Sequence, residues 1–196
     1  MAAVAGRARL RPARGQRSAG RAALVQPLHF AYDPGRGEAL THLARPNPLW
    51  PAVEANPDVV LSVVDDYVYV PGPWQAEPGT PSEHGVPTSL YASVQLRCRA
   101  HLVDDPAQKA ALLNRQTGHF QPEGGSARAA AGEAPYGRLL SGIRGLRLEV
   151  TAVRAKFKYA GKRSASVRER IAAGLSDRDG GRDAEARAHV LRRLKA

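Results

Sequence analysis

The sequence has too little cysteine and too few apolar runs for several classes of protein. Cys98 is the only cysteine among 196 residues, which excludes an internal disulfide framework and a cysteine-rich zinc module. The longest strongly apolar run, residues 59–64, is far shorter than the ~20 residues of a membrane span. No secretory signal is recognisable at the start of the chain. We therefore expect a soluble, cytoplasmic protein that makes no contact with membranes.

Local catalytic motifs are absent as well. The chain has no Walker-type phosphate loop, no Gly-x-Gly-x-x-Gly after a predicted strand, no Gly-x-Ser-x-Gly and no His-Glu-x-x-His. Its six histidines are scattered, without the i, i+4 pairing of a metal-binding helix. Cys98 lies on the inward-facing side of a predicted strand, where a small core residue is expected rather than a nucleophile. We expect neither a catalytic residue nor a metal site.

Acidic residues are missing from the first 24 positions, which carry a charge of +6. Residues 25–154 carry −2 and residues 155–196 carry +7, so the net charge of +11 is concentrated at the two ends. Such basic ends either are solvated tails or make non-specific contacts with nucleic-acid phosphates. Because residues 1–23 show no apolar periodicity, we predict a disordered basic tail there.

Residues 24–175 alternate short apolar runs with turn signals, a pattern that is typical of antiparallel strands. The predicted strands, in chain order, are a hairpin of residues 24–31 with 39–44, a hairpin of residues 59–64 with 67–70 around Asp65-Asp66, and, after a proline-rich loop at 71–87, long strands at 86–103 and 146–157. Most neighbouring strands are joined by hairpins, so the sheet should be mostly antiparallel.

Helices are predicted where capping residues precede apolar periodicity. Asn47 before Pro48 predicts a helix that ends before Pro57, and Asp105 before Pro106 predicts one to about Thr117. The remaining helices are expected near residues 138–143, from Ser166 in a capping box with Glu169 to about Gly174, and at 184–194 after a polar linker at 176–182. Strands and short helices together predict an α+β fold, a small barrel with peripheral helices.

Arg45 stands at the end of a predicted strand, just before the predicted helix start at Asn47. An arginine beside the free N–H groups of a helix N-terminus can bind an anion, because the fixed charge and the helix dipole act together. The alternative is an ordinary helix cap next to a surface arginine. Spacing alone leaves both readings open.

Four sequence blocks, taken together, resemble the bacterial PaiB-type FMN-binding negative transcriptional regulators. They occur in that family's order and at fitting distances across residues 25–175. The blocks are H-L-A-R-P-N-P-L-W at 42–50, Y-V-Y-V-P-G-P-W at 67–74, V-P-T-S-L-Y-A-S-V at 86–94, and G-I-R-G at 142–145 followed by A-K-F-K-Y-A-G-K-R-S at 155–164. Each block alone is weak, and their joint order makes the resemblance specific.

The resemblance implies an FMN-binding split β-barrel of the flavin-reductase and pyridoxamine-oxidase type, assembled as a homodimer with FMN between the subunits. Family members usually begin with a helix and a first barrel strand, whose place here is taken by the Arg/Ala-rich segment. The resemblance therefore predicts a barrel that is incomplete at its N-terminus and weakened FMN binding. It implies a split-barrel domain over residues 24–175, followed by a polar linker and a C-terminal helix over 176–196.

The resemblance also implies where FMN is held. Arg45 and Asn47 match positions that commonly bind the FMN phosphate, and His42 lies on the strand beside them. Trp74, Thr88 and Tyr91 are expected near the flavin or the dimer interface. Lys156 and Lys158 are expected to contact a phosphate or a partner carboxylate, or to lie at a solvated strand end.

Three functions follow from this resemblance. The first is an FMN-binding, PaiB-like negative transcriptional regulator, in which the flavin would supply any redox chemistry. The second is an FMN-dependent oxidoreductase that uses the same pocket. The third is a truncated homologue that no longer binds the cofactor. No helix-turn-helix signature is recognisable, so DNA contact is expected only through the basic ends.

Overall fold

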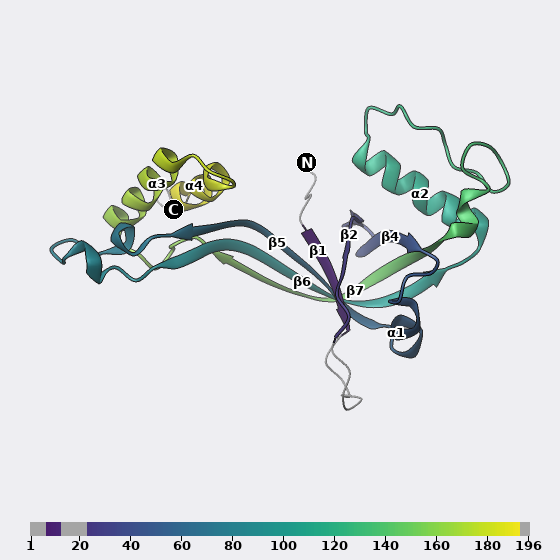
Figure 1. Cartoon of the computed structure of the whole chain (residues 1–196), viewed down its shortest axis with the longest axis horizontal. Helices are drawn as coiled ribbons and strands as arrows, with labels where there is room; N and C mark the ends of the chain where they lie inside the picture. The colour runs from purple at the N-terminus through teal and green to yellow at the C-terminus, as the bar shows by residue number, and fades with distance from the viewer. Residues whose placement is uncertain (1–6, 13–22, 193–196) are drawn as a thin grey trace. The chain divides into compact units, whose positions relative to one another are not determined.

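A computed structural model describes residues 7–12 and 23–192. It contains an antiparallel sheet, four α-helices and three short 3₁₀ helices (Figure 1). The strands are β1 Arg7–Pro12, β2 Gln26–Leu28, β3 Ala31–Asp33, β4 Glu38–Ala44, β5 Asp58–Val70, β6 Thr88–Val103 and β7 Ile143–Lys158. The helices are α1 Trp50–Ala55, α2 Pro106–Phe120, α3 Ala165–Arg178 and α4 Asp183–Arg192, with the 3₁₀ helices η1 Gly72–Gln75, η2 Ser82–His84 and η3 Leu139–Gly142. The predicted α+β class is confirmed.

The chain divides into two compact units. Unit 1 comprises Met1–Val63 and Gln95–Arg154, and unit 2 comprises Val64–Val94 and Ala155–Ala196. The long strands β5, β6 and β7 each contribute residues to both units. Helices α1 and α2 belong to unit 1, whereas α3 and α4 belong to unit 2.

The two outermost strands of the sheet are joined by a very short connection. The strand order is β2-β1-β5-β6-β7-β4-β3, so its two edge strands are β2 and β3. Only His29 and Phe30 separate these two strands in the chain, which ties one edge of the sheet directly to the other. The core of unit 1 is apolar and well filled, since Leu61, Leu146 and Leu148 are all fully buried.

The basic N-terminal segment contributes a strand to this sheet. Strand β1 pairs antiparallel with β2, with Ala8 opposite Leu28 and Leu10 opposite Gln26, and it lies next to β5 in the strand order. The prediction of a disordered tail over residues 1–23 is therefore wrong for residues 7–12. The remaining residues of that prediction, 1–6 and 13–22, lie outside the described residues. The absence of the family's first barrel strand stays a prediction. The alternation of arginine with alanine and leucine in residues 7–12 was too weak a signal to predict a strand. The strand forms because its backbone pairs with β2.

The second predicted hairpin is also wrong. Residues 58–70 form one uninterrupted strand, β5, instead of two strands joined by a turn at Asp65-Asp66. Asp66 has a positive φ of 50°, a conformation that aspartate tolerates better than most residues. The two acidic residues were interpreted as a turn, but Asp66 only deforms the strand locally. The first predicted hairpin is confirmed only next to its turn, where β3 pairs with β4. Most of its predicted first strand, residues 24–31, instead forms β2, which pairs with β1.

In unit 2, helices α3 and α4 pack against one face of the strand ends. Val68 and Val70 of β5 point toward these helices and belong to a core with Leu90, Ile171 and other buried residues. The alternate side chains of the same strand are open to solvent, with Tyr67 60% and Tyr69 53% exposed. One face of this part of the sheet is therefore helix-covered, and the opposite face carries exposed aromatic rings.

The caps of the helices were predicted with mixed success. Asp105 caps α2 as predicted, accepting a hydrogen bond from Gln108 N at 2.9 Å. The cap of α3 is Ser164, not Ser166, and α3 continues past Gly174 to Arg178. Asn47 is not the cap of α1, which begins at Trp50 after Leu49. The Asn47 side chain instead accepts a hydrogen bond from Leu49 N at 2.9 Å and so forms a turn before the helix.

Candidate functional site

Unit 2 contains a basic cavity of about 630 Å³, called here the basic pocket. It lies where the ends of β6 and β7 meet the segment that leads into α3. The residues that line it are Gln75, Val86, Pro87, Thr88, Leu90, Lys156, Phe157, Lys158, Tyr159, Ala160, Gly161, Lys162 and Arg163. Its volume lies within the range of roughly 300–1,000 Å³ that is usual for small-molecule sites.

Two lysines of β7 bring positive charge to this pocket. Lys158 Nζ donates a hydrogen bond to Thr88 Oγ1 at 2.5 Å. Lys156 Nζ and Lys158 Nζ lie 5.7 and 5.8 Å from the centre of the Tyr91 ring, within range of cation–π contact. In the described part of the chain, neither lysine forms an ion pair with a carboxylate. Their charge is therefore available to an anionic ligand.

The far end of the pocket is also basic. Arg163 forms an ion pair of 3.5 Å with Glu77, and both side chains are partly exposed, so this charge is only partly compensated. Lys162 forms no ion pair with any of the described carboxylates. The segment 160–163 turns sharply, with a positive φ of 55° at Ala160 and a hydrogen bond from Arg163 N to Ala160 O. This turn brings both cations to the pocket within one short loop.

Tyr159 closes the inner side of the basic pocket. Tyr159 is 5% exposed, and its ring stacks on the ring of His189 in α4 with centroids 4.3 Å apart. Its hydroxyl donates to Asp66 Oδ2 at 3.3 Å. Burial and the negative charge of Asp66 raise the pKa of Tyr159 well above its usual range. The residue is therefore a neutral wall of the pocket.

Trp74 has a different role from the other predicted residues of unit 2. The Arg178 guanidinium lies 5.2 Å from the centre of its ring. Gly174 lies against the same ring so closely that a Cβ at that position would be 2.5 Å from Trp74 Cε2. Trp74 thus packs onto α3 and is not among the residues that line the basic pocket.

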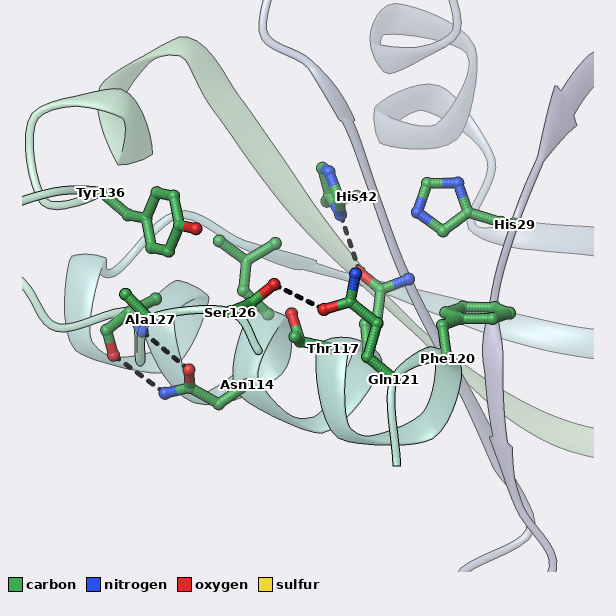
Figure 2. A pocket seen from close by; sticks show the side chains of 12 residues that line it. His29, His42, Asn114, Thr117, Phe120, Gln121, Ser126, Ala127 and Tyr136 are labelled. Atoms are coloured by element: carbon green, nitrogen blue, oxygen red, sulfur yellow. Dashed lines mark hydrogen bonds between the residues drawn. The ribbon is translucent and has the colours of Figure 1, made fainter. Parts of the chain in front are cut away.

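Unit 1 contains a second, smaller cavity of about 300 Å³, called here the histidine pocket. It lies between the β3–β4 hairpin, helix α2 and the loop after α2. Figure 2 shows Tyr136 on one side of it and His29 with Phe120 on the other. The residues that line it are His29, His42, Leu113, Asn114, Gln116, Thr117, Phe120, Gln121, Ser126, Ala127, Ala129 and Tyr136.

A buried glutamine fixes the orientation of His42 in this pocket. Gln116 on α2 is 3% exposed. Its Nε2 donates to Leu40 O at 3.1 Å, and its Oε1 lies 2.7 Å from His42 Nδ1 (Figure 2). The edge of the His29 ring meets the His42 ring with centroids 5.5 Å apart. The β3–β4 pairing, in which Ala31 lies opposite Leu40, brings the two histidines to facing positions.

Arg45 is engaged by groups of unit 1. Its Nε donates to Ser141 O at 2.8 Å, and its NH2 group lies 3.3 Å from Asp104 Oδ1. Asn47 donates from Nδ2 to Gln26 Oε1 at 3.0 Å, while its Oδ1 forms the turn to Leu49. Helix α1 has only six residues, so its dipole is weak. An anion at this place would compete with Asp104 for the arginine.

The predicted site residues therefore separate into two groups. Thr88, Lys156 and Lys158 line the basic pocket of unit 2, and Tyr91 lies beside the two lysines without lining it. The other predicted residues lie elsewhere. His42 lines the histidine pocket of unit 1, and Arg45 and Asn47 lie near α1 in the same unit, while Trp74 supports α3 of unit 2.

Sequence reasoning missed Lys162, Arg163 and Gln116. The two cations follow Lys156 and Lys158 in a run of four basic residues over eight positions, and this run was a usable signal. No local pattern identifies Gln116, because its role depends on the packing of α2 on β4.

Other site chemistry is limited. Within residues 7–12 and 23–192, no three His, Cys, Asp or Glu side chains gather as metal ligands. Cys98 is buried, and burial raises the pKa of its thiol to about 11, as expected for a core residue. None of the helices in the described ranges has the length and apolar character needed to cross a membrane.

A protein-family model described as a putative FMN-binding domain matches residues 15–152. A comparison with curated protein sequences gave no match.

Several solved structures are similar to the chain. The FAD and heme binding protein from Mycobacterium smegmatis has a TM-score of 0.57 and 20% identity, over 85% of this chain and 71% of that chain. The flavocytochrome Anf3 from Azotobacter vinelandii has a TM-score of 0.55 and 19% identity, over 77% and 61%. A putative 5-nitroimidazole antibiotic resistance protein from Bacteroides thetaiotaomicron has a TM-score of 0.53 and 12% identity, over 77% and 76%. At these identities the likeness concerns the fold, and it confirms the split-barrel type.

Proposed function

Because the chain belongs to the family of FMN-binding domains whose model matches residues 15–152, we propose that it binds FMN and that the basic pocket holds the phosphate. The observation that carries the proposal is the pair Lys156 and Lys158, which are free of carboxylate partners among the described residues and line a cavity of about 630 Å³ with Thr88. Lysine ammonium groups and a hydroxyl are suitable donors for a phosphate.

The residues of the basic pocket fit a flavin nucleotide in charge and in size. Lys158 and Thr88 would donate hydrogen bonds to the phosphate, with Lys156 as a second cation. Tyr91, which already lies beside both ammonium groups, offers an aromatic surface. The neutral Tyr159 and the apolar Leu90 would exclude water from the inner end. When bound, FMN supplies one- and two-electron redox chemistry.

The alternative position for the phosphate is Arg45 with Asn47, as the sequence resemblance implies. The ion pair between Arg45 and Asp104 argues against it, since a phosphate there would need to displace a carboxylate or lie beside its negative charge. Among the described residues, no carboxylate competes with a phosphate for the lysines of the basic pocket. This difference in local charge makes the basic pocket the preferred position.

Binding of FMN and of riboflavin, followed by flavin fluorescence, tests the proposal directly. The combined variant Lys156→Gln, Lys158→Gln is expected to weaken FMN binding by about tenfold or more, because two charge-assisted contacts of roughly 1 kcal/mol each are lost. Riboflavin, which lacks the phosphate, should bind the variant and the unaltered protein alike. Arg97→Gln with Arg99→Gln is a matched control that removes two exposed charges from β6 in unit 1.

The same titration separates the two phosphate positions. Arg45→Ala should leave FMN binding within about twofold of the unaltered protein, an effect typical of exposed charges. Loss of FMN binding in Arg45→Ala, with full binding in the lysine variant, would overturn the assignment to the basic pocket. A protein that takes up neither FMN nor riboflavin would overturn the flavin proposal itself and favour a homologue without cofactor.

We propose, as the finer function, a negative transcriptional regulator of the PaiB type in which flavin binding modulates the protein. The support is the ordered set of sequence blocks over residues 25–175. The second candidate is an FMN-dependent oxidoreductase, which is supported by the likeness of the fold to a flavocytochrome and to an FAD and heme binding protein. Turnover of a reduced nicotinamide by FMN-loaded protein favours the oxidoreductase, and salt-sensitive DNA binding without such turnover favours the regulator.

We further propose a homodimer, as the resemblance implies. The support in unit 2 is the open sheet face, on which Tyr67 and Tyr69 expose more than half of their side-chain surface. Sedimentation equilibrium of the unaltered protein and of Tyr69→Glu is the test. A dimer that the substitution dissociates supports this face as the interface, and a monomer at all concentrations contradicts the proposal.

A further inference from the structure

His42 presents an unused hydrogen-bond acceptor at the histidine pocket. Gln116 donates to Leu40 O through Nε2, so its Oε1 is left to accept from His42 Nδ1. The proton of the neutral imidazole is therefore on Nδ1, and Nε2 carries the acceptor lone pair. Within residues 23–192, no group donates a hydrogen bond to Nε2 of His42.

Two other amide side chains line the histidine pocket, and each forms hydrogen bonds of its own. Asn114 is bonded through both of its polar atoms to the backbone of Ala129, at 2.8 Å in each case. Gln121 accepts a hydrogen bond of 2.5 Å from Ser126. His42 differs from these two amides because the buried Gln116 holds its Nδ1, which leaves Nε2 as the ring nitrogen that faces a ligand.

The histidine pocket is uncharged and partly aromatic. No Asp, Glu, Lys or Arg is among the residues that line it. Partial burial and the nearby His42 lower the pKa of His29, so this second histidine is neutral at pH 7. Phe120 meets the His29 ring edge-on, with centroids 5.6 Å apart, and Leu113 and Ala129 add apolar surface. An ionic ligand would find no counter-charge here.

The volume of the histidine pocket limits the size of the ligand that it can hold. At about 300 Å³ the cavity has less than half the volume of the basic pocket, which suits one compact ring system better than a whole flavin nucleotide. The rings of His29 and Phe120, which meet edge-on, favour a planar aromatic ligand. The Nε2 acceptor of His42 pairs with an N–H or O–H donor on such a ligand.

From this geometry we propose that the histidine pocket of unit 1 is a separate small-molecule site, which binds an uncharged planar aromatic compound through an N–H or O–H donated to Nε2 of His42. The inference goes beyond the flavin proposal, because the residues involved belong to unit 1 and share none with the basic pocket.

Indole and benzofuran are matched probes for this site. The two have nearly the same shape, but indole carries an N–H donor where benzofuran has an oxygen that cannot donate. We expect ¹H–¹⁵N spectra of the full chain to show saturable shifts around Phe120 and Ala129 with indole. Indole should bind about five- to tenfold more tightly than benzofuran, the ratio expected for one hydrogen bond to an otherwise unpaired acceptor.

Two variants locate the donor contact. His42→Phe keeps a ring of similar size but removes the acceptor, so indole should bind it no more tightly than benzofuran. His84→Phe, an exposed histidine in unit 2, is the matched control and should keep the full preference for indole. The comparison of the two probes on the unaltered protein stands by itself even where His42→Phe fails to fold.

Three results would overturn the inference. The first is the absence of saturable shifts near the pocket with indole. The second is equal affinity of the unaltered protein for indole and benzofuran. The third is competition between indole and FMN, which would make the histidine pocket part of the flavin site. Because FMN uptake is measured independently, failure of this inference is distinguishable from failure of the flavin proposal.

Discussion

Arg144 joins three elements of unit 1, and its removal is a sensitive test of how that unit is held together. From β7 its Nε and NH2 donate to the two oxygens of Asp104 at 3.0 and 2.7 Å, and its NH1 donates to Glu54 Oε1 on α1 at 2.6 Å. The guanidinium also lies 5.2 Å from the centre of the Trp50 ring. We expect Arg144→Ala to lower the free energy of unfolding of unit 1 more than any exposed arginine does.

The size of this loss in unfolding free energy depends on how exposed Arg144 and its two carboxylate partners are. The Arg144 side chain is 14% exposed, but Asp104 and Glu54 are 47% and 49% exposed. Solvent therefore reduces each ion pair to about 0.5–1 kcal/mol. The cation–π contact adds about 0.5 kcal/mol, and the buried aliphatic stem adds roughly 1 kcal/mol. The two ion pairs, the cation–π contact and the stem together give an expected loss of about 2.5–3.5 kcal/mol.

Urea denaturation followed by circular dichroism measures this loss, with Arg99→Ala as the control. Arg99 forms a single ion pair of 3.7 Å with Asp58, and both side chains are more than half exposed, so its removal should cost at most about 0.5 kcal/mol. A loss in Arg144→Ala that is no larger than that of the control would refute the reasoning.

The difference between Arg144→Ala and the unaltered protein should also depend on pH. Hydrogen bonding from Arg144 is the main cause that lowers the pKa of Asp104. A carboxyl whose pKa is lower in the folded state stabilises the fold above its unfolded pKa of about 3.9. This stabilisation is lost as the pH falls through the folded pKa. The stability difference should therefore be constant from pH 5 to 8 and shrink below about pH 4.

Three further predictions concern packing, capping and reactivity. Gly174→Ala places a Cβ against the Trp74 ring. It should destabilise unit 2 by about 1–3 kcal/mol and change the tryptophan fluorescence emission. If both the stability and the emission are unaltered, the close approach of Gly174 to Trp74 is contradicted. Ser164→Ala should cost about 1 kcal/mol in thermal or urea unfolding because it removes the α3 cap, whereas Ser166→Ala should cost almost nothing; equal losses would contradict the cap assignment. The Cys98 thiol, with its pKa raised to about 11, should react with a disulfide reagent at pH 8 only after denaturant is added, and rapid reaction in the folded protein would contradict its burial.

Where side-chain alternation was strong, the sequence predicted the fold well. Leu96, Cys98 and Ala100 of β6 are buried and Arg97 and Arg99 are exposed, as the period of two indicated. The cap at Asp105 was predicted for the same kind of reason, because capping depends on residues close in sequence. Local rules were sufficient in both cases.

Local rules failed where pairing or packing decides the structure. A pair of acidic residues, Asp65-Asp66, has a turn-like composition, but ion pairs from Arg182 to both carboxylates hold it within β5. In the candidate site, three of the predicted residues, Thr88, Lys156 and Lys158, line one pocket. Arg45 is held by Asp104, which lies 59 positions away in the chain. Contacts at this sequence distance leave no periodic trace, so pairing of this kind could not be predicted from one sequence.

The place of β1 within the sheet has a practical consequence for any attempt to shorten the protein. An arginine-rich beginning invites removal of residues 1–23, for instance to ask whether that end binds DNA. Such a deletion would also withdraw β1, which lies between β2 and β5 in the strand order. Both neighbours would then present unpaired backbone groups, which promote aggregation through exposed strand edges. If the shortened protein no longer bound DNA, the cause could be the damaged sheet as readily as the loss of a nucleic-acid contact. Arginine-to-glutamine substitutions leave the backbone in place, so they test more cleanly whether the N-terminal arginines bind DNA.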